Sequence, residues 1–304
     1  MKLYAPEYYK KFKCIADKCK HSCCIGWEID IDSDTLEKYA AVHHGYGKQI
    51  ADSISLSDTP HFVLRENQKC PHLNNKGLCN IILNLGEDYL CDICREHPRF
   101  YNNTVHGMEV GLGLSCEEAC RIVLSDDDYD SFFVLEEIDQ KPLNCNYDAV
   151  KARNEIYKLL SDKSSEYQKR IQNISRFHSI DLTATSQNEW AETIASLEYL
   201  DNSHKELFLN FSPNAVAPPE IELFCERFLA YLIYRHCSPA SDENEYRAAL
   251  FFSLFCEKLL ASAVESSKDH SFQNVVNLSR IISEEIEYSE DNTETIKSVY
   301  YFNI

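Results

Sequence analysis

Apolar positions in the second half of the chain recur with the period of helices. Val275, Leu278 and Ile282 form one stripe, which is the spacing of a helix that buries one face. Residues 220–237 and 247–264 are apolar on most faces, as in helices that lie inside a bundle. The pattern predicts helices over residues 147–173, 187–200, 219–237, 244–267 and 270–289.

Glycine is confined to the first part of the chain. All eight glycines lie at or before Gly113. Because glycine supplies the left-handed turns of tight loops and the close backbone approach of phosphate cradles, the glycine-free remainder is typical of helices joined by polar or proline-containing connections. Gly111 and Gly113 are a lone pair, not a dinucleotide-binding glycine motif. The sequence therefore argues against a Rossmann-type domain.

The first part of the chain predicts shorter elements. Residues 27–32 alternate between apolar and polar and predict a short strand. Residues 34–37 resemble a capping box that opens a helix, and another helix start is expected within residues 86–94. Residues 115–118 resemble a second capping box, which places Cys116 at a helix N-terminus, where the helix dipole favours a thiolate.

Together these patterns predict a mainly α fold. We expect a cysteine-rich, metal-binding N-terminal region with short strands, followed by an all-helical bundle. The predicted boundaries are a cysteine-cluster region over residues 1–124, an acidic connection over residues 125–146 and a helical bundle over residues 147–304.

Charge and hydropathy limit the partners and the compartment. The chain has 30 basic and 49 acidic residues, a net charge of -19. This balance disfavours nucleic acid, which binds basic surfaces, and suits a cationic partner such as a lysine side chain. The simpler interpretation is that the charge only keeps the protein soluble. The N-terminus has no apolar core of a secretion signal, and Glu257 and Lys258 interrupt the most apolar stretch. We expect a cytoplasmic protein with no membrane partner, and its oligomeric state stays open.

Cysteines supply the candidate chemistry. Ten of the 14 lie between Cys14 and Cys120, in ligand-like clusters. Clustered cysteines in the cytosol more often bind metal than form disulfides. Structural zinc takes four Cys or His ligands, and an iron–sulfur cubane takes four thiolates, so the spacing leaves both metals open. The spacing of radical S-adenosylmethionine enzymes is absent, because Gly26 stands where its third cysteine would be.

Some cysteines and histidines near these clusters have simpler explanations. A lone histidine is more often a surface or hydrogen-bonded residue than a ligand, so His21, His72 and His97 are not included in the metal site. Three cysteines on the apolar helices, Cys225, Cys237 and Cys256, are interpreted as small buried side chains.

The segments between the cysteines resemble a known family. These segments are residues 1–27, Cys70–Ile81, Cys94–Arg99, Leu114–Ala119 and, more loosely, Leu278–Asn292. They resemble flagellin lysine-N-methylases, bacterial proteins that methylate lysines on the surface of the flagellar filament protein. The cysteine part also resembles a wider group of zinc- or iron-chelating proteins.

The resemblance implies S-adenosylmethionine-dependent methylation of lysine ε-amines on flagellin, with a cysteine-ligated centre that is a 4Fe–4S cluster or zinc. No catalytic residue is assigned. Arg95 and Arg99 flank a cysteine motif and are candidates for the cofactor's carboxylate, with a surface ion pair as the alternative. The cysteine pattern alone would also suit a non-enzymatic zinc- or iron-binding adaptor.

Eight cysteines match the family pattern and are the implied metal ligands: Cys14, Cys19, Cys23, Cys24, Cys70, Cys79, Cys94 and Cys116. Cys91 and Cys120 look like local additions and rank lower as ligands.

Overall fold

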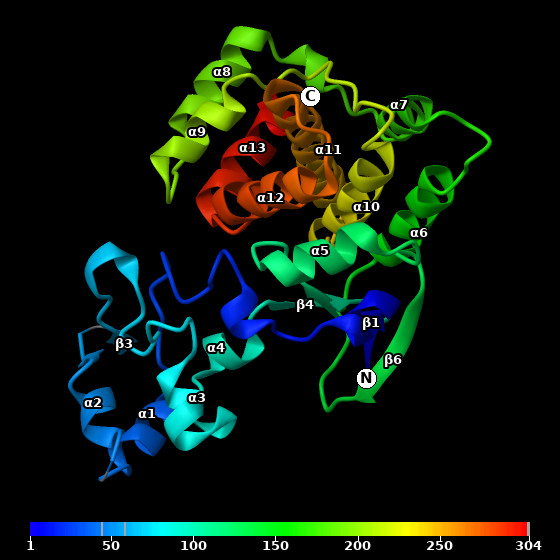
Figure 1. Cartoon of the computed structure of the whole chain (residues 1–304). Helices are drawn as coiled ribbons and strands as arrows, with labels where there is room; N and C mark the ends of the chain where they lie inside the picture. The colour runs from blue at the N-terminus through cyan, green and yellow to red at the C-terminus, as the bar shows by residue number, and fades with distance from the viewer. Residues whose placement is uncertain (44, 58, 303–304) are drawn as a thin grey trace. The chain divides into compact units, whose positions relative to one another are not determined.

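The computed structural model describes residues 1–43, 45–57 and 59–302 (Figure 1). The chain forms two compact units. The helical unit comprises Met1–Phe12 and Phe100–Ile304, and the cysteine unit comprises Lys13–Arg99. These boundaries differ from the predicted regions 1–124, 125–146 and 147–304 because the first strand of the chain pairs with strands of the helical unit.

A mixed four-stranded sheet carries the N-terminus. Its strands are β1 (Lys2–Pro6), β4 (Arg99–Thr104), β5 (Gly107–Leu112) and β6 (Phe132–Glu137), in the order β4-β5-β1-β6. β1 runs parallel to β5, with Leu3 opposite Met108, and antiparallel to β6, with Ala5 opposite Phe133.

The strand β6 lies within the predicted acidic connection over residues 125–146. The acidic run ends at Asp130, and the next residues, from Phe132 onward, are aromatic and aliphatic. Side chains of this kind fit a pleated, half-buried strand. β1 supplies the partner for that strand.

Helices make up most of the helical unit, which confirms the mainly α prediction (Figure 1). They are α5 (Glu117–Ser125), α6 (Ala149–Leu160), α7 (Tyr167–Phe177), α8 (Gln187–Ser196), α9 (Asn202–Phe208), α10 (Glu222–Leu232), α11 (Glu243–Ser267), α12 (Phe272–Ile282) and α13 (Glu290–Phe302). α11 contacts α10, α12 and α13. The predicted single helix over 147–173 is two helices, because a polar turn follows Leu160 and Asp162 accepts hydrogen bonds from Ser164.

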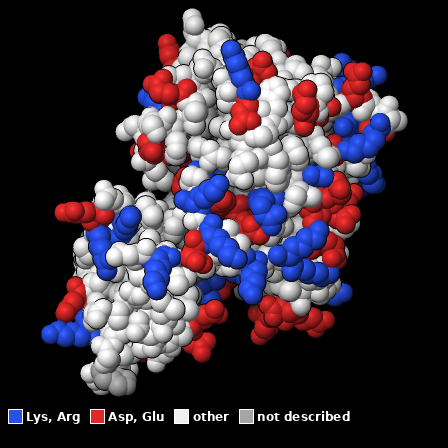
Figure 2. Space-filling view, viewed as in Figure 1, with Lys and Arg blue, Asp and Glu red and all other residues white. Residues whose placement is uncertain are grey.

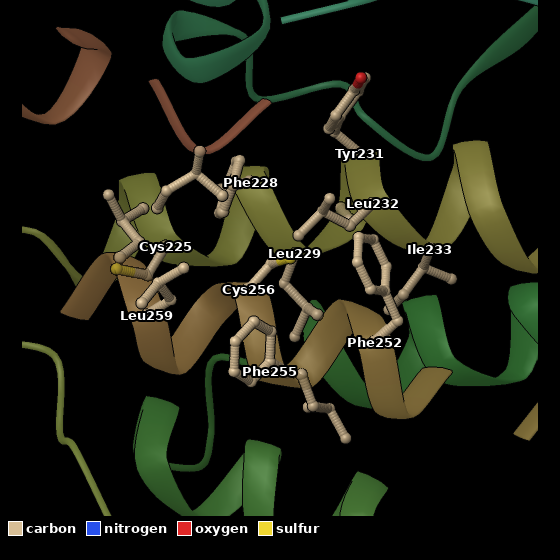
Figure 3. Packing of buried hydrophobic residues seen from close by; sticks show 14 of the residues in the cluster. Cys225, Phe228, Leu229, Tyr231, Leu232, Ile233, Phe252, Phe255, Cys256 and Leu259 are labelled. Carbon is tan, nitrogen blue, oxygen red and sulfur yellow. The ribbon is translucent and has the colours of Figure 1, made fainter. Parts of the chain in front are cut away.

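The bundle core forms where α10 packs against α11. Cys225 and Cys256 lie among Phe228, Leu229 and Phe255 in this contact (Figure 3). Both thiols are completely buried, and burial raises their pKa well above the ordinary value. Uncharged, enclosed thiols of this kind are packing residues, in agreement with the interpretation of these cysteines as small buried side chains.

The surface of the protein carries both signs of charge. Acidic and basic side chains are interspersed on the face shown in Figure 2, in spite of the net charge of -19. No helix within residues 1–43, 45–57 and 59–302 is long and apolar enough to span a membrane. In α11, the longest helix among the described residues, Glu257 and Lys258 lie buried in the second half of the helix.

The cysteine unit is built from short elements. They are α1 (Ser33–Ala40), α2 (Gly47–Ala51), β2 (Ile54–Ser55), β3 (His61–Phe62), α3 (Asn80–Leu85) and α4 (Asp92–Glu96). β2 and β3 pair antiparallel. α1 begins earlier than predicted, because the carboxylate of Asp32, not Asp34, accepts the Thr35 N–H at 2.9 Å.

The predicted strand over residues 27–32 is wrong. The segment is extended and buries Ile29 and Ile31, but within the described residues it forms only the isolated bridge between Asp30 and His61. The alternation therefore identifies an extended segment with one buried face. Its partner β3 is only two residues long, too short for a strand to continue.

Candidate metal centre

Five cysteines share the small core of the cysteine unit. Cys70 and Cys91 are 5% and 1% exposed, and three partly buried cysteines pack against the same core. We call this set the thiol core: Cys24, Cys70, Cys79, Cys91 and Cys94. The apolar side chains around it include Ile29, Ile31 and Phe62. The interior position distinguishes these thiols from surface cysteines.

Paired extended segments bring Cys24 beside Cys70. The Cys70 N–H donates to the Cys24 carbonyl oxygen at 2.9 Å, and the Gly26 N–H donates to the Gln68 carbonyl oxygen at 2.9 Å. Gly26 has a φ of +87°, a conformation that glycine adopts without a steric penalty. The turn after Cys24 thus depends on the glycine that interrupts the radical-enzyme spacing.

Helix starts position the other thiols of the core. Cys79 precedes α3 and Cys91 precedes α4, and neither side chain caps its helix. Cys94 lies in the first turn of α4, and its N–H donates to the Cys91 carbonyl oxygen at 3.0 Å. The helix start predicted within residues 86–94, with Glu87 and Asp88 in its first turn, is a short 3-10 helix over Glu87–Tyr89, and α4 begins separately at Asp92. The carboxylate of Asp32 fixes it by accepting the Asp92 N–H at 2.8 Å.

Backbone N–H groups lower the pKa of three of the five thiols. The donors lie two or three residues after each cysteine: His72 and Leu73 for Cys70, Ile81 and Ile82 for Cys79, and Cys94 for Cys91. Successive N–H groups that face one atom form an anion-binding arrangement that is common at iron–sulfur sites. This effect works against burial, which raises the pKa of both Cys70 and Cys79.

The electrostatics of the thiol core favour a bound cation. A hydrogen bond from Cys23 lowers the pKa of Cys24 to about 7, and a hydrogen bond with Cys94 lowers the pKa of Cys91. Burial raises the pKa of Cys70 to about 12, and repulsion from the Cys24 thiolate adds to it. Thiolates bind metals, and a cation among them would relieve this repulsion.

His72 is unavailable as a ligand even though it is buried near the thiol core. Its Nδ1 lies 2.8 Å from the Tyr46 hydroxyl and its Nε2 lies 3.0 Å from the Ser53 hydroxyl. The imidazole ring also packs edge-on against Phe62, with centroids 4.6 Å apart. Burial lowers the pKa of His72 to about 4, so the ring is neutral and both nitrogens are already bonded.

The thiol core contains half of the predicted ligands. Cys24, Cys70, Cys79 and Cys94 lie in it. Cys14, Cys19 and Cys23 belong to the same unit but not to this core, and Cys14 and Cys23 are exposed. Cys116 belongs to the helical unit, where it precedes α5 as predicted, but its side chain makes no capping hydrogen bond.

The two cysteines that ranked lower have different surroundings. Cys120 is fully buried in the helical unit, and its thiol donates to the Val276 carbonyl oxygen at 3.4 Å. Cys91 lies in the thiol core. The signal for Cys91 is its Cys-x2-Cys spacing with Cys94, which lies outside the family pattern.

The predicted cofactor arginines are engaged in local contacts. Arg95 pairs with the carboxylate of Asp92, and its Nη1 donates to the Leu90 carbonyl oxygen at 3.2 Å. Arg99 donates to the Arg95 and Glu96 carbonyl oxygens at 3.3 and 3.5 Å. The alternative interpretation of Arg95 as a surface ion pair describes its observed contacts.

One group of side chains in the helical unit brings potential oxygen and nitrogen metal ligands close together. Within the described part of the chain, His204, Glu284 and Glu285 place ligand atoms within 4.8 Å of one another. Glu285 already accepts hydrogen bonds from His204 at 2.6 Å and from the Leu200 N–H at 2.7 Å. Glu284 pairs with Arg280. These partners account for the cluster without a metal.

A buried carboxylate organises the helical unit where two helices end in π-helical turns. Glu287, in the turn Ser283–Glu287, accepts hydrogen bonds from the hydroxyls of Tyr231 at 2.7 Å and Ser283 at 2.5 Å. His236 Nε2 and Arg235 Nε, in the turn Ile233–Cys237, lie 3.0 and 3.2 Å from the same carboxylate. Burial alone would raise the pKa of Glu287, but Arg235 and the hydrogen bonds bring it to about 2. Sequence reasoning missed this network, and the only signal for it is charge within an otherwise apolar helix.

The fold and the thiol core together define a mainly helical protein with a cysteine-lined centre suited to a metal. The chain is 26% identical to a lysine-N-methylase of Salmonella typhimurium over 136 residues, which cover 40% of this chain and 32% of that protein. It is 29% identical to the flagellar biosynthetic protein FliU of Salmonella muenchen over 130 residues, which cover 40% of this chain and 77% of FliU.

These matches confirm the resemblance: over about 40% of its length the chain is similar to lysine-N-methylases and to a flagellar biosynthetic protein. The chain matches about a third of the length of the lysine-N-methylases, with 32% of each covered. No protein-family model and no solved structure matches it.

Proposed function

We propose that the chain methylates lysine ε-amines on flagellin, with S-adenosylmethionine as methyl donor and a cysteine-ligated metal centre. The observation that carries the proposal is the similarity to lysine-N-methylases. The similarity to FliU, a flagellar biosynthetic protein by name, supports a flagellar substrate. Because the relatives are matched over part of their length, the activity of the whole relative is proposed for this chain.

The chemistry sets requirements that the chain must meet. A lysine ammonium titrates near ~10.4 and must lose a proton before its nitrogen can attack a methyl carbon. S-adenosylmethionine supplies an electrophilic methyl group on a sulfonium. Glu287 is a poor candidate for the base, because its pKa is held at about 2. We keep Arg95 as a proposed contact of the cofactor's carboxylate, which would then displace Asp92 from its ion pair.

The donor set of the thiol core fits a metal centre. It offers five thiols in one core, and backbone N–H groups lower the pKa of three of them, Cys70, Cys79 and Cys91. A single zinc with Zn–S bonds of about 2.3 Å would hold its sulfurs about 3.8 Å apart. No three of these thiols, within the described residues, lie within 4.8 Å of one another.

We propose a zinc ion or an iron–sulfur cluster as the centre, since both take four cysteine ligands. We propose a structural role for the centre. It would hold together the segments around Cys24, Cys70, Cys79 and Cys91, which have few regular elements of their own.

The direct test is a methylation assay on the full chain. The protein is purified without oxygen, its metal and acid-labile sulfide are measured, and it is incubated with S-adenosylmethionine and flagellin. Intact mass spectrometry should show the gain of methyl groups on flagellin, and peptide mapping should place them on lysines. Cys70→Ser should lose the centre, whereas Cys145→Ser, in a loop of the helical unit, should keep both the centre and the activity.

An unchanged flagellin mass, with the metal centre intact, would exclude the proposed activity under these conditions. It would favour the non-enzymatic metal-binding adaptor, which the thiol core supports equally well.

A further inference from the structure

We propose that the strand β6 is a docking edge, which a basic, extended segment of the protein substrate joins as a fifth strand of the sheet. This inference rests on the proposed function, and it names the kind of segment that is recognised and the place where it binds. A strand at the end of a sheet leaves one row of backbone N–H and C=O groups unpaired, and an added strand can pair with that row.

β6 is an open edge of the sheet. The strand order β4-β5-β1-β6 places it at one end, with β1 as its neighbour. The Glu7 N–H donates to the Ser131 carbonyl oxygen at 3.0 Å, and Pro6, which has no N–H, lies opposite Phe132. Because residues of an antiparallel strand alternate between bonding to the neighbour and pointing away from it, the backbone groups of Phe132 and Val134 face outward. No hydrogen bond within the described parts of the chain reaches them.

The opposite edge of the sheet, formed by β4, is contacted by another segment of the chain. The Leu143 N–H donates to the Thr104 carbonyl oxygen at 2.9 Å. The side-chain amide of Asn103 donates to the Lys141 carbonyl oxygen at 3.5 Å. The segment that follows β6 therefore bonds to β4 and leaves β6 open.

Exposed apolar and acidic side chains follow one another along β6. Val134 and Leu135 are 44% and 40% exposed, and the next two residues, Glu136 and Glu137, are exposed as well. Neither these glutamates nor Asp139, just after the strand, forms an ion pair with any described residue. Figure 2 shows acidic side chains gathered at the lower end of the helical unit, where β6 ends in Figure 1. The edge therefore offers carboxylates without a cation.

The charge of this edge favours a basic partner. Charged side chains, together with the register shift between Leu3 and Tyr4, discourage pairing with an apolar strand. Lysine or arginine in an incoming strand would instead meet the free carboxylates, and opposite charges on facing strands stabilise a pair. Apolar residues of the same segment would cover Val134 and Leu135. A second copy of this chain would bring the same carboxylates to the edge and no cation to balance them.

The test measures how the full chain binds an end-labelled peptide of alternating lysine and valine, by fluorescence anisotropy and without S-adenosylmethionine. The parent protein should bind the peptide. Glu136→Gln combined with Glu137→Gln should raise the Kd about five-fold, the size expected for two exposed ion pairs. The matched control, Glu192→Gln combined with Glu206→Gln, removes the same charge from exposed positions on α8 and α9 and should leave the Kd unchanged. Hydrogen exchange of residues 132–137 should slow when the peptide is bound.

A second peptide separates strand addition from simple charge attraction. Methylation of its backbone amides keeps the charge but removes the hydrogen-bond donors, so this peptide should bind much more weakly. Equal binding of both peptides would overturn the proposal, and so would unchanged hydrogen exchange of β6 or an unchanged Kd in the doubly substituted protein. A dimer joined through β6 that the peptide does not dissociate would overturn it as well.

The binding test is independent of methyl transfer. Peptide binding at β6 in a protein that leaves flagellin unmodified would refute the proposed activity and keep the docking edge. Methylation of flagellin by a protein that does not bind the peptide would refute the docking edge and keep the activity.

Discussion

Replacing Glu287 by glutamine should destabilise the helical unit in a pH-dependent manner. The side chain of Glu287 is fully buried between Arg235, His236, Ser283 and Tyr231. An amide keeps the shape of the carboxylate but removes its charge. Arg235, whose side chain is only 14% exposed, would then lie without its counter-ion, and leaving one partner of a buried pair uncompensated typically costs about 3–5 kcal/mol.

The size of the effect follows from the pKa of Glu287. The pKa falls from the ordinary 4.5 to about 2, and at about 1.4 kcal/mol for each pKa unit this corresponds to about 3 kcal/mol of stability at neutral pH. Because the folded pKa is depressed, this stability is present above pH 4.5 and is lost as the pH falls toward 2. By pH 3, about 2 kcal/mol of it should be gone.

Urea unfolding gives the measurement. Trp190, which is completely buried, reports the helical unit when Trp27 is replaced by Phe in every protein compared. The free energy of unfolding of Glu287→Gln should be lower than that of the parent by about 3 kcal/mol at pH 7 and by about 1 kcal/mol near pH 3. Glu290→Gln, at an exposed position three residues away, is the matched control and should change little.

Two results would refute this reasoning. One is a Glu287→Gln protein whose urea midpoint equals that of the control at pH 7. The other is a loss of stability that stays constant between pH 7 and pH 3, which would mean that the loss does not come from the charge of Glu287.

Three further changes test other parts of the structure. Gly113→Ala should destabilise the helical unit by about 1–3 kcal/mol in urea unfolding, because a Cβ would overlap the Tyr288 hydroxyl and lie 2.9 Å from Arg235 Nη1. Arg153→Met should cost about 3–5 kcal/mol by leaving Glu109 buried without its partner at 2.7 Å, and adding Glu109→Leu should restore much of that loss; no recovery would argue against the ion pair as the cause. Metal removal by a chelator should expose residues 13–99 to proteolysis and change the fluorescence of Trp27 while that of Trp190 stays constant; simultaneous loss of both signals would contradict a structural role confined to the cysteine unit.

The helices could be predicted from the sequence because their signals are local. The apolar pattern gave 244–267 for α11, which the structure places at Glu243–Ser267. The sheet could not be predicted in the same way. Residue Leu3 of β1 lies opposite Met108 of β5 and Glu136 of β6, and no local pattern near the N-terminus specifies partners so distant in sequence.

The candidate site shows the same division between local and distant information. Spacing and family resemblance identify which cysteines are unusual, since that information lies within short motifs. Which thiols share a site depends on how the segments around Cys24, Cys70 and Cys91 meet, and this follows from backbone hydrogen bonds such as that between Cys70 and Cys24. The rank of Cys91 among the ligands therefore depends on a tertiary contact that a local pattern does not contain.

The interior position of the thiol core favours a structural centre over a redox centre. The apolar residues buried in the cysteine unit are few, namely Ile29, Ile31, Tyr39, Ile50, Phe62 and Ile81. A unit with so small a core needs a further source of stability, and a structural metal is one that small domains use. Cys70 and Cys91 are 5% and 1% exposed, so a metal held by them would be shielded from substrates in solution. The thiols that face the solvent, Cys14 and Cys23, lie outside this core and would not share that shielding.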